Sequence, residues 1–195
     1  MKTVIFTILF GFTFINVSFC QELLEGQKRW SSENKLKKED YKIKVNNINN
    51  DIIYTQITIS HKVSGFDFFK KNFNKNVENI FLGNASWIDS TKIKNLNEQI
   101  EFQQLQFDLA EVEARKFRKE ILKNRKQIAK GFNIINQISN DILAEFSEVR
   151  LQIMLETESG ENKQKIFEWK EKIAAELIEL NDFSYENNKK IHLNK

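Results

Sequence analysis

The chain of 195 residues contains no proline, one cysteine and two histidines. The single cysteine, Cys20, cannot close an intramolecular disulfide, so the chain must be stabilised by a packed core. The two histidines are His61, on a predicted strand, and His192, near the end of the chain. A lone histidine on a strand is more often structural than a metal ligand, and zinc needs three protein ligands. The scarcity of ligand residues therefore argues against an ordinary zinc centre.

The charges show no strong imbalance. Thirty lysines and arginines stand against 27 aspartates and glutamates, for a net charge of +3. Acids and bases interleave along the chain, and no basic patch with interleaved aromatics is present. Nucleic acid is therefore not expected as a partner.

The first twenty residues have the composition of a secretory signal peptide. Lys2 precedes a nearly unbroken apolar run from Val4 to Phe19, and small Ser18 lies three positions before Gln21. We expect cleavage after Cys20, which leaves a secreted or periplasmic chain without cysteine. An uncleaved anchor and lipid attachment at Cys20 are the alternatives. No other stretch is apolar enough to span a membrane, so no stable span is expected in the mature chain.

Periodicity divides the rest of the chain into strands followed by helices. Residues 21–34 form a polar lead-in, 35–180 a single domain, and 181–195 a polar tail expected to fray. Strand-like alternation covers 41–45, 53–60 and 77–87, with turn chemistry at 46–51, while 66–76 fits strand or helix. Three helices are predicted: 92–125, starting at a Ser90 or Thr91 cap; one carrying a stripe from Ile135 to Ile153; and one from Ile166 to Leu180. Gly131 and Ser159-Gly160 separate them.

This order predicts an α+β fold in which a small N-terminal antiparallel sheet packs on a C-terminal bundle of three helices. A long helical hairpin or coiled coil is the alternative for the C-terminal half, because the stripes run near a 3.5-residue period.

The stretch 101–118 is apolar on two sides. One row comprises Leu96, Ile100, Gln103, Phe107, Ala110, Ala114 and Phe117, and a second comprises Phe102, Leu105, Leu109 and Val112. Only a narrow sector, which includes Glu111 and Arg115, is polar. A helix with two apolar faces lies between two layers, so this helix is expected at the centre of the fold. Gln103 interrupts the first row and is expected to be buried and hydrogen-bonded.

The same helix resembles that of a bacterial family of predicted secreted zinc-dependent proteases. Members carry His-Glu-x-x-His followed by Phe-Asp-x-x-Glu-x-x-Ala-Arg-Lys-x-Arg, and the second half stands here intact as Phe107, Asp108, Glu111, Ala114, Arg115, Lys116 and Arg118. Leu36 to Tyr41, Ser86-Trp87-Ile88 and the set Glu156 to Gly160, Gln164 and Trp169 are similar to three further family motifs. The resemblance covers about residues 35–180 and implies a zincin-like fold.

The metal-binding half of that pattern is replaced. The two histidines of the helix fall on Phe102 and Gln106, its glutamate on Gln103, and a downstream histidine on Ser159. A phenylalanine cannot bind zinc, a glutamine amide is a poor ligand, and it cannot accept a proton as a general base. The resemblance therefore implies a pseudoenzyme without metal or cofactor.

The former cleft is then expected to bind a peptide or an envelope protein, as a binding or scaffold domain. Gln99, Glu111, Glu113 and Arg115 are candidate pocket residues beside the former site. Glu113 shares a helix face with Gln106, so an improvised carboxylate site is conceivable, whereas Glu111 and Arg115 fit an ordinary helix pair. The alternatives are an active hydrolase with a non-standard site and a mostly helical envelope interaction protein unrelated to zincins.

Overall fold

The computed structural model describes residues 23–46, 51–62, 73–92, 95–131 and 133–191. The predicted signal peptide with Cys20, most of the predicted turn at 46–51, most of the ambiguous stretch 66–76, and His192 lie outside the described residues.

The N-terminal half forms two short three-stranded sheets. In the first, β5 (Val77–Leu82) lies between β1 (Gln27–Arg29) and β4 (Ile57–His61), and all pairs are antiparallel. In the second, β6 (Trp87–Asp89) pairs antiparallel with β3 (Ile53–Tyr54) and parallel with β2 (Ile43–Val45). The α+β class is confirmed, but the expected single antiparallel sheet is two sheets, one of which holds a parallel pair. The expected lead-in also supplies a strand, β1.

The division between the sheets arises at a short 3-10 turn, Gly83–Ala85. A side chain at Gly83 would come within 2.3 Å of the Asp40 carbonyl oxygen, so only glycine permits this close approach. The Ser86 hydroxyl accepts the Gln56 N–H at 2.9 Å and donates to the Leu82 carbonyl at 2.7 Å. The Ser86 side chain thus takes the place of a backbone hydrogen bond at the junction between the two sheets.

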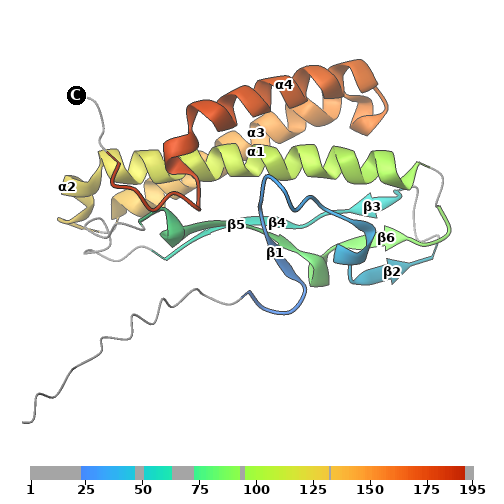
Figure 1. The fold of residues 1–195 in the computed structure, drawn as a ribbon, viewed down its shortest axis with the longest axis horizontal. Helices are drawn as coiled ribbons and strands as arrows, with labels where there is room; N and C mark the ends of the chain where they lie inside the picture. The colour runs from blue at the N-terminus through green and yellow to red at the C-terminus, as the bar shows by residue number, and fades with distance from the viewer. Residues whose placement is uncertain (1–22, 47–50, 63–72, 93–94, 132, 192–195) are drawn as a thin grey trace, which may run out of the picture.

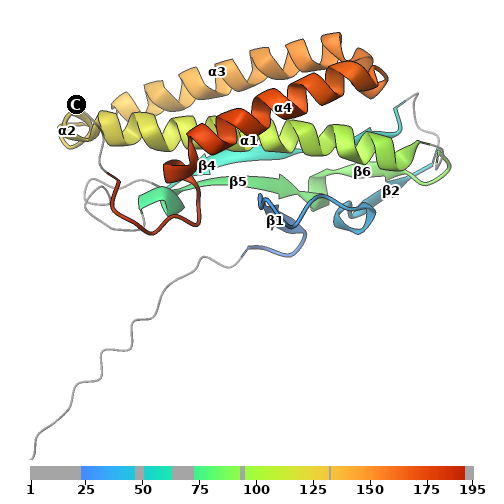
Figure 2. The same ribbon diagram turned by 45° about the horizontal axis from the view of Figure 1, so that its top comes forward.

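The helices are α1 (Leu96–Lys123), the short α2 (Arg125–Ile128), α3 (Asn133–Glu156) and α4 (Lys163–Glu179). Helix α1 lies across the sheets, and α3 and α4 cover its other side (Figures 1 and 2). The central position predicted for this helix is confirmed, and each outer helix packs along α1, unlike an isolated coiled coil. Among the described residues, no helix combines the length and apolarity needed to cross a membrane.

The start of α1 differs from the prediction. The residue before the helix is Asn95, in a left-handed conformation with φ of 68°. Thr91 does not cap the helix, because its N–H and hydroxyl both donate to the Asp89 carboxylate, at 2.9 and 2.6 Å. The Ser90 hydroxyl bonds the Val45 carbonyl instead.

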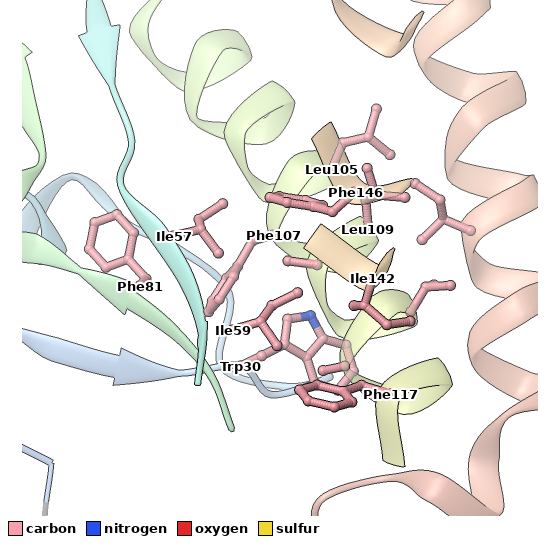
Figure 3. Close-up of a cluster of buried hydrophobic side chains, with 14 of the residues drawn as sticks. Trp30, Ile57, Ile59, Phe81, Leu105, Phe107, Leu109, Phe117, Ile142 and Phe146 are labelled. Atoms are coloured by element: carbon pink, nitrogen blue, oxygen red, sulfur yellow. The ribbon is translucent and has the colours of Figure 1, made fainter. Parts of the chain in front are cut away.

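The core has two parts, one on each side of α1. Phe107 points toward Ile57 and Ile59 of β4, and Leu105 and Leu109 lie toward α3, with Ile142 and Phe146 (Figure 3). All these side chains are buried. Both apolar rows of the sequence are therefore used, one against strands and the other against helices.

The polar sector of α1 is not entirely solvated. Glu111 is 1% exposed and accepts hydrogen bonds from Arg115 Nε at 3.1 Å and Arg118 Nη1 at 2.9 Å. Arg118, fully buried, also donates to the Val77 carbonyl of β5 and the Phe183 carbonyl near the C-terminus. The pair Glu111–Arg115, expected to be an ordinary helix pair, therefore belongs to a buried network that joins helix and sheet.

The same network corrects the expectation that the chain frays from Asn181. Phe183 is buried, and Asn74 Nδ2 donates to the carbonyls of Asp182 and Ser184 at 3.0 and 2.9 Å. These residues are polar in composition, but their backbone carbonyls are held by buried donors.

Candidate functional site

A pocket of about 380 Å³ lies at the N-terminal half of α1. Its other walls are strand β3 with its flanking residues, the last turns of α3, and the turn that follows α3. The described lining residues are Asp51, Ile52, Ile53, Tyr54, Thr55, Gln99, Phe102, Gln103, Gln106, Arg150, Met154, Glu158, Ser159 and Glu161. The volume falls in the range of about 300–1,000 Å³ typical of small-molecule sites.

The four positions assigned to the degenerate metal site all line this pocket. Phe102, Gln103 and Gln106 come from α1, and Ser159 comes from the turn after α3. Gln99, one of the candidate pocket residues, lines it as well. Glu111, Glu113 and Arg115 do not, since they lie further along α1 and are buried elsewhere. The fold thus brings together segments that are far apart in the sequence.

The turn after α3 reaches α1 through an unusual backbone. Glu158, Ser159 and Gly160 have φ values of 52°, 56° and 102°, all in the left-handed region. A Cβ at Gly160 would stand 3.0 Å from the Phe102 ring, so the backbone passes directly over that ring. Buried Thr157 anchors the turn by donating its hydroxyl to the Ile153 carbonyl at 2.6 Å. Left-handed non-glycine residues cost about 1–3 kcal/mol each and concentrate at functional sites.

The buried part of the pocket carries two amides and a guanidinium. Gln106 is 1% exposed, and its Oε1 accepts the Nε–H of Arg150 at 2.6 Å. Gln103 is 8% exposed, as predicted, but its amide forms no hydrogen bond with another described residue. The expectation of a hydrogen-bonded Gln103 is therefore not met among the described residues.

Sequence reasoning did not identify Arg150, Met154 or the β3 residues as part of the site. Arg150 directly follows Val149 of the apolar stripe of α3, and a cation beside such a stripe is ordinarily solvated. The strand residues were recognised as strand but could not be placed next to α1. Only the three-dimensional arrangement assigns them to the pocket.

The side chains at the four positions do not fit a zinc ion. Phenylalanine has no lone pair to offer, and two amides and a hydroxyl are weak ligands compared with imidazole, thiolate or carboxylate. In the described part of the chain, no three histidine, cysteine, aspartate or glutamate residues are grouped as a metal site would require. The pocket is suited to hydrogen bonding and charge pairing.

Glu113 lies outside the pocket, in a cluster between the helices. Its carboxylate is fully buried, and burial raises its pKa to about 7, although the hydrogen bond from Lys116 at 2.8 Å lowers it. Lys116 also bonds Glu145 at 2.7 Å. His61, on β4, packs edge-to-face on Phe117 with ring centroids 5.3 Å apart, and burial lowers its pKa. Both residues lie away from the pocket.

The intact half of the helix motif forms structural contacts. Asp108 Oδ1 accepts hydrogen bonds from Trp30 Nε1 at 2.6 Å and from Gln104 Nε2 at 2.7 Å. Glu111 and Arg118 form the buried network described above. Trp169 of α4 donates to Glu156 Oε2 at 2.9 Å, which ties α4 to the end of α3 beside the pocket turn.

No protein-family model, curated protein or solved structure matches the chain.

Proposed function

We propose that the chain is an exported, catalytically inactive homologue of the predicted secreted zinc-dependent proteases, and that its pocket binds a peptide or an envelope partner. One observation carries the proposal. Phe102, Gln103, Gln106 and Ser159, the positions at which the resemblance requires metal ligands and a base, line one pocket. This shared lining supports the proposal, because the resemblance implies a cleft at these positions and the side chains there are suited to binding.

Further support comes from the parts of the motif that remain. Asp108, Glu111 and Arg118 all hold α1 in place through buried or half-buried hydrogen bonds. A chain that loses catalysis but keeps its fold is expected to retain such structural contacts, whereas its metal-ligand and general-base positions can be substituted. Export rests on the composition of residues 1–20.

The experiment is capture of partners from the envelope fraction of the source cells by the mature protein. Met154, on α3 and lining the pocket, is replaced by tryptophan to fill the pocket mouth. Leu155→Trp is the matched control, because Leu155 is 70% exposed on the same helix and does not line the pocket. We expect Met154→Trp to reduce capture at least tenfold and Leu155→Trp to leave it unchanged. Equal capture by both variants, or peptidase activity of the wild type, would contradict the proposal.

A further inference from the structure

Arg150 supplies the pocket with a cation that has no ion-pair partner among the described residues. Arg150 is half-buried, and its Nε–H is used by Gln106. The four N–H groups of its two terminal nitrogens form no hydrogen bond with a described residue, and no described carboxylate forms an ion pair with it. Its other contact is with the Phe146 ring, whose centroid lies 6.0 Å from the guanidinium carbon. Burial lowers the pKa of Arg150, and its interaction with Tyr54 partly offsets this effect.

Gln103 adds a second polar group that is accessible from the pocket. Its side chain is more than nine-tenths buried, lines the pocket, and forms no hydrogen bond with a described residue. Since neither amide atom of Gln103 is among the buried, unpartnered side-chain atoms of the described residues, the amide is accessible from the pocket. A ligand that accepts a hydrogen bond from the Gln103 amide while it pairs with Arg150 would satisfy both groups.

The rim of the pocket has the opposite charge. Three exposed carboxylates line it: Asp51, Glu158 and Glu161. Such a rim repels a ligand with several negative charges, including a free phosphate dianion. It favours a ligand that carries one anionic group toward Arg150 and a cationic group at the mouth.

We propose that this pocket binds the free C-terminal carboxylate of a peptide that carries a basic residue at its end. The carboxylate pairs with the terminal nitrogens of Arg150 and accepts the Gln103 N–H, while the basic side chain lies near Glu158 and Glu161. Arginine binds planar carboxylates through two parallel hydrogen bonds, which makes it suited to this task. The inference rests on the proposed function and specifies its ligand.

Three tripeptides test it by isothermal titration calorimetry on the purified protein. They are Ala-Ala-Lys with a free C-terminus, the same peptide with a C-terminal amide, and Ala-Ala-Glu with a free C-terminus. We expect Ala-Ala-Lys to bind at least tenfold more tightly than either of the others. Equal affinity for the acid and the amide would overturn the carboxylate assignment while leaving peptide binding, and so the proposed function, intact.

Variants then assign the effect to the pocket. Arg150→Gln is expected to abolish the preference for the acid over the amide, and Gln103→Leu to reduce it. Arg125→Gln is the matched control, since Arg125 is exposed on α2 and should leave all three affinities unchanged. Circular dichroism establishes that the variants are folded. Absence of binding of all three peptides to the wild type would overturn the inference, and the capture experiment with Met154→Trp would still decide the proposed function separately.

Discussion

Replacing Arg118 by leucine measures how much the buried network contributes to stability. The guanidinium is fully buried and donates to the Val77 carbonyl from Nε at 3.2 Å and from Nη2 at 2.7 Å. Its Nη1 donates to Glu111 and to the Phe183 carbonyl, both at 2.9 Å. Leucine removes every one of these donors and leaves two carbonyls and part of a buried carboxylate without partners.

Removing one partner from a buried charged pair costs about 3–5 kcal/mol, a large share of the roughly 5–15 kcal/mol by which a domain is stable. Glu111 retains Arg115, so we expect the lower part of that range, about 3 kcal/mol. For a domain of this size the melting temperature should fall by about 2–4 °C per kcal/mol. Urea unfolding followed by circular dichroism measures the free energy of unfolding directly.

Arg125→Leu is the control, because Arg125 is exposed on α2 and should change stability by about 0.5 kcal/mol or less. Limited proteolysis provides a second measurement, since the Phe183 carbonyl loses a donor and the C-terminal segment should become easier to cleave. A loss below about 1 kcal/mol, with unchanged cleavage near Phe183, would refute the structural role given to Arg118.

Three further experiments test the site and the helix cluster. A triple variant with Phe102→His, Gln106→His and Ser159→His should bind one zinc ion per chain, as measured by elemental analysis. All three positions line one pocket, and histidine tolerates the left-handed backbone of residue 159. A triple variant that folds but binds no zinc would contradict a shared ligand geometry. Gln103→Leu should leave the free energy of unfolding in urea unchanged or raise it by about 1 kcal/mol, because removing the amide leaves no described hydrogen-bond partner unsatisfied. A decrease of more than about 1 kcal/mol would indicate that the Gln103 amide has a hydrogen-bond partner. Burial raises the pKa of Glu113 to about 7 in the folded protein, above its ordinary 4.5, so the folded state binds more protons than the unfolded state between these pH values. The free energy of unfolding should therefore fall by about 2–3 kcal/mol as pH rises through that window. Glu113→Gln should flatten this fall, and an unchanged pH profile in the variant would refute the assignment.

The sequence alone determined the class of fold and the place of its main helix. Two apolar rows separated by a narrow polar sector can be buried only between two layers, and the structure places strands against one row and α3 and α4 against the other. The breaks at Gly131 and Ser159-Gly160 were also readable, because glycine marks the ends of helices. Local periodicity is sufficient for such features, since each depends on residues close in the chain.

The site depended on contacts that no local pattern contains. The position of Ser159 beside α1 was an expectation from the resemblance, and its approach requires three consecutive left-handed residues that the sequence signals only at Gly160. Arg150 could not be assigned to the site from the sequence, because the sequence pattern around a cation on a helix is the same whether its side chain faces water or a pocket. For Glu111 and Arg115, the spacing of four predicts that the two side chains pair, and they do. It does not predict that the pair is buried, because that depends on Arg118 and on the Leu177 carbonyl, which only the tertiary structure brings to them. Periodicity therefore fixed which faces are apolar, and packing decided which polar groups are buried with them.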